Sequence, residues 1–226
     1  MVQQQAEATI SEVSQPQEPQ KALNLRPGEH VLMAGTTGSG KTTLAKSFLS
    51  ARTYVISIDT KHDNRWDGFV ITSDINRIFR RRRGDNGRYI FRPEFGLRGI
   101  MQIAEICDRA YREGGWNVHF DELYQCTARS GTSQGFPPPL VRIWTAGRSK
   151  GVTGWGCTQR PKFIPIFCMS ESTHFFLFEL GNKEDLKHVA KMSGVDKLAV
   201  PMSGHQFLYY NRRSQVVQRM VLDTDE

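Results

Sequence analysis

The residues with the clearest chemistry lie in the segment AGTTGSGKTT, residues 34–43. It fits the pattern G-x-x-x-x-G-K-[ST], follows an apolar run and opens a helical pattern. Glycines let backbone N–H groups turn inward around phosphate oxygens, and the helix N-terminus adds its dipole. The segment therefore predicts a nucleoside triphosphate site that is built from Gly35, Thr36, Thr37, Gly38, Ser39, Gly40, Lys41, Thr42 and Thr43.

Two of these side chains have tasks of their own. Lys41 is expected to neutralise charge on the β- and γ-phosphates, and the Thr42 hydroxyl is expected to ligate Mg²⁺. A second apolar run, WNVHFDE at 116–122, ends in Asp121 and Glu122. Asp121 would hold the Mg²⁺, and Glu122 would polarise a water for attack on the γ-phosphate. A helix N-cap followed by a first-turn acid is the alternative explanation of this pair.

The identity of the nucleotide depends on a third motif. Asn182–Asp185 fits N-K-x-D, a pattern that reads guanine, and it follows an apolar run. Asp121, however, is not followed by the glycine of D-x-x-G that GTPases use to sense the γ-phosphate. Asn182 is better explained as the N-cap of an amphipathic helix. We therefore expect ATP and Mg²⁺ as the cofactors.

Short apolar runs alternate with helical patterns along the chain. The runs predict strands at 29–35, 53–60, 116–122, 152–159 and 173–180, and the patterns predict helices at 41–51, 73–82, 98–112 and 183–192. Such alternation predicts an α/β fold with a mostly parallel sheet flanked by helices. A C-terminal β-hairpin is expected at 205–222. The strand at 53–60, which the chain places between the two motifs, favours the RecA/ASCE-like branch of P-loop NTPases, whose ATPases use a catalytic glutamate.

Composition divides the 226 residues into a tail and one domain. Residues 1–25 are rich in Gln, Glu, Ser and Pro and predict a flexible tail, and residues 26–226 form the ATPase domain. No signal peptide is visible, and no run of about 18 apolar residues could span a membrane. The net charge of +7 favours a polyanionic partner, and a solvated basic surface is the alternative explanation.

The segment TAGRSKGVTGWGCTQRPKFIP, residues 145–165, resembles the FtsK–HerA superfamily of DNA-pumping ATPases. In that family, G-R-[KS]-x-G-[IV] leads into a strand that ends T-Q-R-P. Asp59 and Lys61 are similar to the family's D-x-K, and the closing segments STHFFLFEL and GHQFLYYN agree as well. The resemblance covers nearly all of residues 26–222. Because the chain lacks large extra domains, it resembles the genome-packaging ATPases of membrane-containing icosahedral viruses such as the tectiviruses.

The resemblance assigns further roles. Gln159 matches the polar sensor on the strand beside Asp121. Arg148 matches an arginine that would be inserted as a finger into a neighbouring subunit's site, and Arg160 is the competing candidate. A finger acting in trans implies a homo-oligomeric ring, a hexamer by analogy. The alternative explanation of both arginines is a basic loop on a solvated face.

The function implied by the resemblance is an ATP-driven double-stranded DNA translocase that packages a viral genome into a preformed capsid. Virion vertex or portal proteins would be further partners, and the protein would be found at the packaging vertex of the virion and in the host cytoplasm. The alternatives are another FtsK–HerA-type DNA pump, a nucleotide-gated assembly protein without DNA-stimulated hydrolysis, and a small-molecule kinase.

Two segments are candidates for contact with DNA. RIFRRRRGDNGR at 77–88 holds six arginines, which could neutralise backbone phosphates or lie on a charged surface or subunit interface. The polar loop at 126–139 carries Arg129 and could face the pore of a ring.

Overall fold

The computed structural model describes residues 10–12, 23–80, 87–127, 137–198 and 202–222. The strands are β1 Ile10–Glu12, β2 His30–Ala34, β3 Tyr54–Ile58, β4 Val70–Thr72, β5 Gly87–Phe91, β6 Asn117–Phe120, β7 Thr153–Thr158, β8 Ser172–Leu177, β9 Gln206–Asn211 and β10 Val216–Val221. The α-helices are α2 Lys41–Leu49, α3 Ile75–Phe79, α4 Leu97–Glu113, α5 Leu123–Thr127, α6 Pro138–Ala146, α7 Ile166–Ser170 and α8 Lys183–Ser193. Short 3₁₀ helices are η1 Gly147–Lys150, η2 Pro161–Phe163 and η3 Asp196–Leu198.

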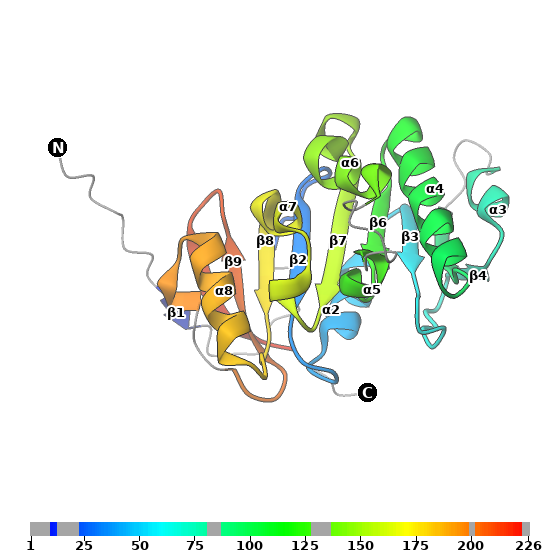
Figure 1. Cartoon of the computed structure of the whole chain (residues 1–226). Coiled ribbons are helices and arrows are strands. Elements are labelled where there is room, and N and C mark those ends of the chain that lie inside the picture. Colours follow the sequence, from blue (N-terminus) through cyan, green and yellow to red (C-terminus); the bar gives the residue numbers. More distant parts are fainter. Residues whose placement is uncertain (1–9, 13–22, 81–86, 128–136, 199–201, 223–226) are drawn as a thin grey trace.

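Within the described residues the strands form one ten-stranded sheet in the order β1-β10-β9-β8-β2-β7-β6-β3-β5-β4 (Figure 1). In this order, each strand from β8 to β4 is parallel to the next. Strands β9 and β10 pair antiparallel, so the expected C-terminal hairpin is present. The predicted mostly parallel α/β fold is confirmed.

The strand order explains how the two motifs are related in space. β2, which precedes the glycine-rich segment, and β6, which precedes Asp121, do not pair with each other, because β7 lies between them. The strand predicted at 53–60 is present as β3, but it lies on the far side of β6. The strand between the two motifs is therefore the one that ends in Thr158, next to Gln159.

Both faces of the central strands are buried, as a parallel sheet requires. Val31 and Met33 of β2 pack on the side of α2, with Leu44 and Phe48. Leu32 and Ala34 face the opposite side, where the apolar residues of α4, α6, α7 and α8 lie. Figure 1 shows these four helices side by side over one face of the sheet. This packing fixes the carboxyl ends of the parallel strands along one edge.

The N-terminal segment differs in part from the expected tail. β1 pairs parallel with β10, with Ile10 opposite Val217, and Leu25 is only 4% exposed in the core. The backbone N–H and C=O groups of β10 that do not pair with β9 are the hydrogen-bond partners of β1. Leu25 is held in place by burial of its own apolar side chain. Residues 1–9 and 13–22 lie outside the described residues.

No helix in the described part of the chain is long and apolar enough to cross a membrane. The sequence patterns did not predict β4, β5 and the helices α5, α6 and α7. β4 has only three residues, and the short apolar run of β5 lies close after a stretch of arginines in the sequence. Arg81, Arg82, Arg83 and Arg129, which are candidates for DNA contact, lie outside the described residues.

Candidate active site

The glycine-rich loop leaves β2 at Gly35 and enters α2 at Lys41. The Gly35 N–H donates to the Thr158 carbonyl at 3.0 Å, which joins the loop to the end of β7. A Cβ on Gly35 would lie 2.6 Å from the Phe178 Cβ, so only glycine fits there. Gly40 has φ 103°, a left-handed conformation that favours glycine. Because α2 has no acid in its first turn, its N-terminus keeps its partial positive charge for an anion.

Lys41 lies on the inner side of this loop. Its Nζ donates to the Thr36 carbonyl at 2.6 Å, and the residue is 7% exposed. Burial lowers the pKa of the Lys41 ammonium, although the neighbouring carboxylates of Glu122 and Asp121 act in the opposite direction. The side chain is thus a buried cation at the centre of the predicted phosphate site.

Thr42 and Asp121 meet at the start of α2 and the end of β6. The Thr42 hydroxyl donates to Asp121 Oδ1 at 2.9 Å, although the two residues are far apart in the sequence. A hydroxyl beside a carboxylate is the set of hard oxygen donors that Mg²⁺ prefers. The residues present therefore fit the predicted metal.

The carboxylate of Asp59 lies close to this pair but has a structural role. Oxygens of Asp59, Asp63 and Asp121 lie within 4.8 Å of one another. Asp59, however, is fully buried and accepts hydrogen bonds from the backbone N–H groups of His62 and Asn64. Its oxygens are used to hold the backbone, so Asp121 is the better placed ligand.

Glu122 follows Asp121 and turns into the wall of the site. It is 5% exposed, and its Oε1 has no hydrogen-bond partner among the residues that the structure describes. Burial raises the pKa of the Glu122 carboxyl, while a hydrogen bond from Thr158 and the charge of Lys61 act to lower it. A buried acceptor with a free oxygen can orient a water molecule and take up its proton.

Gln159 extends β7 and reaches the glycine-rich loop. Thr37 Oγ1 donates to its Oε1 at 3.0 Å. These side chains share one cleft of about 360 Å³. The residues that line it are Thr37, Gly38, Lys41, Thr42, Lys61, Asp63, Asn64, Asp121, Glu122 and Gln159. Tertiary structure thus brings together the predicted loop, the acidic pair and the predicted sensor.

Arg148 lies elsewhere. The site for a Cβ on Gly28, just before β2, is 3.1 Å from the Arg148 Cα, so this arginine is at the amino ends of the parallel strands. The five residues of β2 span roughly 16 Å, at about 3.3 Å per residue, and this length separates the amino ends of the strands from the glycine-rich loop at their carboxyl ends. Arg148 is exposed and does not line the cleft.

Arg160 is held by contacts within the chain. Its Nε pairs with Asp185 Oδ2 at 3.0 Å, and its guanidinium lies 4.7 Å from the centre of the Phe163 ring. Asp185 is in the first turn of α8, whose N-cap is Asn182: the Glu184 N–H donates to Asn182 Oδ1 at 2.8 Å. The N-cap interpretation of the N-K-x-D segment is therefore confirmed.

Lys61, Asp63 and Asn64 line the cleft but were not predicted to do so. One indication of this site was present in the sequence: Asp59 and Lys61 match the D-x-K pattern of the family, although the pattern assigned them no chemical role. These residues lie in a turn after β3. The turn is close to Asp121 because β3 pairs with β6, and local sequence patterns do not reveal that pairing.

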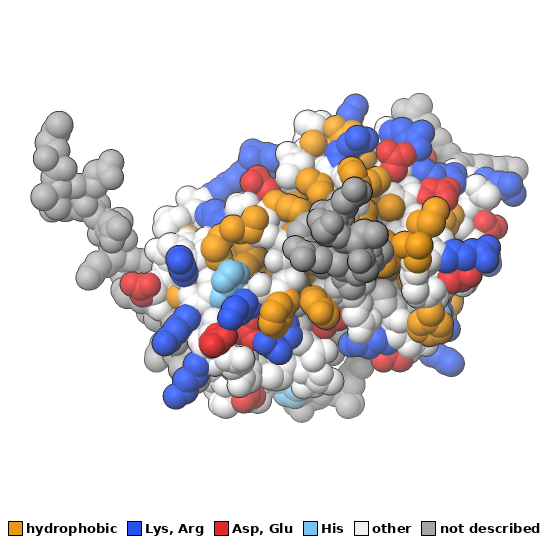
Figure 2. All heavy atoms as spheres, viewed as in Figure 1, with side chains coloured by type: hydrophobic (Ala, Val, Ile, Leu, Met, Phe, Trp, Pro, Cys, Tyr) orange, Lys and Arg blue, Asp and Glu red, His pale blue; other side chains and the backbone are white. Residues whose placement is uncertain are grey.

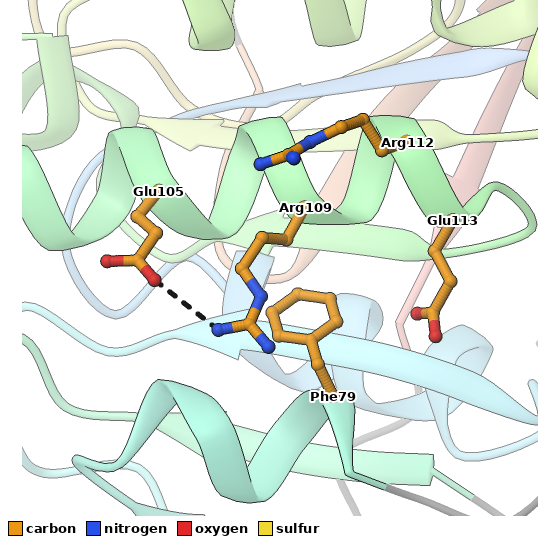
Figure 3. Close-up of a pocket in the computed structure, with 5 residues that line it drawn as sticks. All are labelled: Phe79, Glu105, Arg109, Arg112 and Glu113. Atoms are coloured by element: carbon orange, nitrogen blue, oxygen red, sulfur yellow. Dashed lines mark hydrogen bonds and ion pairs between the residues drawn. The ribbon is translucent and has the colours of Figure 1, made fainter.

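The described part of the basic run gives little support for a phosphate-binding groove. Arg77 and Arg80 are exposed, but Arg88 donates to the Arg52 carbonyl at 2.7 Å and belongs to the fold. Figure 3 shows the hollow between α3 and α4, where Arg109 lies 4.5 Å over the Phe79 ring and pairs with Glu105. The charges that line this hollow are two arginines and two glutamates, so they balance.

The fold and the cleft together define a P-loop NTPase of the RecA/ASCE-like branch. The glycine-rich loop, the Thr42–Asp121 pair and Gln159 all lie where the parallel strands end, and β7 separates β2 from β6. At such an edge the helix N-terminus and the strand ends converge on one ligand.

Known proteins with similar sequence or fold point to a narrower group. No protein-family model matches the chain. The DNA packaging ATPase P9 of Enterobacteria phage PRD1 is 27% identical over 172 residues, which cover 74% of this chain and 71% of P9. The genome packaging NTPase B204 of Sulfolobus turreted icosahedral virus 2, in complex with ATP-gammaS, has a TM-score of 0.69 at 16% identity and covers 88% of this chain and 100% of its own. The bacterial conjugative coupling protein TrwB has a TM-score of 0.63 at 10% identity, with 89% and 86% covered.

These similarities confirm the predicted resemblance. The chain has the P-loop NTPase fold and resembles the viral genome-packaging ATPases of the FtsK–HerA type.

Proposed function

We propose that this protein is an ATP-driven motor that packages double-stranded DNA into a preformed viral capsid. The observation that carries the proposal is the sequence similarity to P9 of phage PRD1, a DNA packaging ATPase. The shared fold with B204, a genome packaging NTPase, supports it. Association with the virion follows from the same relationships, and the packaging vertex and the host cytoplasm are the places we propose for the protein.

The cleft supports a division of roles in ATP hydrolysis. The loop from Gly35 to Thr43 and Lys41 would bind the phosphates, and Thr42 and Asp121 would hold Mg²⁺. A bound Mg²⁺ would neutralise charge on the β- and γ-phosphates. Glu122 would orient the attacking water and accept its proton, and Gln159 would contact the γ-phosphate or that water. Glu122 suits this role because the residue lines the cleft and its buried Oε1 has no hydrogen-bond partner among the described residues.

We further propose a homo-oligomeric ring, a hexamer by analogy, in which Arg148 acts on the neighbouring subunit. Arg148 is exposed at the edge opposite to its own cleft, which suits a finger that acts in trans. Large apolar side chains are exposed at Phe95, Met101, Phe163 and Ile166, and Figure 2 shows apolar side chains gathered on the face that carries α4 and α7. Exposed apolar surface of this kind is typical of contacts between subunits.

The proposal is tested by ATP hydrolysis with and without long double-stranded DNA, beside the Glu122→Gln variant. We expect DNA to stimulate turnover in the wild type. The variant should still bind ATP but lose about 10²–10⁴-fold in rate, the usual contribution of a general base. Glu171→Gln, at an exposed residue away from the cleft, is the control and should hydrolyse like the wild type.

Turnover that DNA does not change would contradict the motor. It would favour the alternative of a nucleotide-gated assembly protein, in which ATP acts as a structural switch.

A further inference from the structure

A turn built around Asp59 presents Lys61 to the phosphate cleft. Asp59 Oδ1 accepts from the His62 N–H at 2.9 Å, and Oδ2 accepts from the Asn64 N–H at 3.1 Å and from Arg92 Nε at 3.3 Å. The carboxylate is fully buried, so this bonding compensates for its loss of water. The backbone between Ile58 and Asn64 is thus fixed from within the protein.

His62 adds a second constraint on the same turn. Its φ of 64° is left-handed, a conformation that residues with a side chain adopt only at an energetic cost. Its ring Nε2 is 2.8 Å from the Pro93 carbonyl, which holds the residue in place. Thr60 Oγ1 donates to Gln125 Oε1 at 2.6 Å and so connects the turn to α5, directly after Glu122. Strained backbone persists where the surroundings determine it strongly, and it is frequent at functional sites.

The turn places Lys61 in the same cleft as Lys41. Lys61 Nζ lies 3.9 Å from Asp121 Oδ2, and its side chain is 36% exposed. Both lysines line the cleft, together with the carboxylates of Asp63, Asp121 and Glu122. A triphosphate must therefore enter a cleft with two cations and three anions. Without Lys61, Lys41 would be the one lysine among the described residues of the cleft that offsets the negative charge of these three carboxylates. The loss of positive charge would be greatest near Asp121, which Lys61 contacts.

We propose that Lys61 is a second cationic contact for the γ-phosphate, which lets the site distinguish a nucleoside triphosphate from a diphosphate. The inference rests on the proposed ATPase function and adds a residue to the same site. Lys41 comes from the loop that surrounds the phosphates, whereas Lys61 comes from the side of Asp121 and Glu122, where the terminal phosphate must lie for attack. A flexible ammonium can follow that phosphate as a mobile point charge.

The test compares nucleotide affinities of the full-length chain with Mg²⁺ present. Binding of AMPPCP, a triphosphate analogue, and of ADP is measured by calorimetry for the wild type, Lys61→Gln and Lys61→Arg. Lys61→Gln should weaken AMPPCP binding about ten- to a hundredfold, the range of a charge-assisted hydrogen bond. ADP binding should change less than about threefold, and Lys61→Arg should recover much of the lost affinity because it keeps the charge.

Controls separate this role from others. Lys187→Gln, an exposed lysine on α8 outside the cleft, should bind both nucleotides like the wild type. An equal loss for AMPPCP and ADP, or no loss for either, in a Lys61→Gln protein that melts like the wild type would overturn the inference and leave the ATPase function standing. Failure of the wild type to bind either nucleotide would overturn both.

Discussion

At the scale of single residues, two arginines from one sequence segment have different surroundings. Arg160 pairs with the buried Asp185 and stacks on Phe163. Arg148 is exposed on η1, at the opposite edge of the sheet. An arginine that already holds its own fold together is a poor finger for a neighbour, because it would have to leave a buried carboxylate. The geometry therefore favours Arg148 over Arg160.

Replacement of Arg160 should affect stability and leave catalysis intact. In Arg160→Ala, Asp185 loses its cation but keeps the hydrogen bond from the Lys162 N–H, so the loss of unfolding free energy should be roughly 1 kcal/mol for this half-exposed pair. Denaturant unfolding and ATPase assays on the same preparation would show it. If turnover is abolished while the melting temperature is unchanged, the finger is Arg160.

At the scale of elements, a buried polar network joins the C-terminal hairpin to the start of β2. Glu29 accepts from Arg213 at 2.6 Å and lies 2.9 Å from His174 Nε2, and His174 Nδ1 is 2.9 Å from the Tyr209 hydroxyl. Burial lowers the pKa of His174, and the positive charges of Arg213 and Arg52 add to this effect. Burial alone would raise the pKa of Glu29, but the contacts with His174, Arg26 and Arg213 outweigh it, so the pKa falls.

Both shifts make the fold less stable as the pH falls. The folded pKa of His174 lies below the ordinary histidine value of 6.5, so stability declines as the pH falls below about that value. Glu29 has a folded pKa below 4.5, so its contribution is present above that value and is lost as the pH falls through the folded pKa. Melting temperatures should therefore fall between about pH 7 and pH 4. His174→Gln, which does not titrate, should show a smaller fall between about pH 7 and pH 5, and an unchanged slope would exclude His174 as the cause.

At the scale of the whole molecule, the cleft and Arg148 lie on opposite edges of one sheet. In the ring that we propose, a head-to-tail contact brings the arginine of one subunit to the cleft of the next, and such contacts form a ring when the rotation between subunits closes. The net charge of +7 suits the proposed ring, which would hold a polyanion without reading its sequence.

Two inactive variants should restore activity when they are mixed. Lys41→Ala lacks a working cleft but keeps Arg148, whereas Arg148→Ala lacks the arginine but keeps the cleft. In a random equal mixture, roughly a quarter of the head-to-tail contacts would pair an intact cleft with an intact arginine. ATPase activity of the mixture should then rise well above that of either variant alone. A mixture as inactive as its components would place the arginine in its own subunit or remove it from the mechanism.

The sequence by itself determined the features that depend on local chain geometry. Turns, helix starts and alternating apolar residues are encoded within a few positions of the chain. For this reason the sequence could predict the glycine-rich loop, the C-terminal hairpin, the Asn182 cap and the strands β2, β3, β6, β7 and β8. The short β4 and the β5 run behind its arginines could not be recognised in this way.

Only the tertiary structure decided which of these pieces meet. The contacts of Thr42 with Asp121 and of Thr37 with Gln159 arise because β7 lies between β2 and β6, an order set by packing of the whole sheet. The same strand order places the Asp59 turn and Lys61 beside Asp121. Arg148 lies at the amino ends of the parallel strands, on the side opposite to the cleft. Contacts between residues distant in sequence depend on strand order and register, which no local pattern contains.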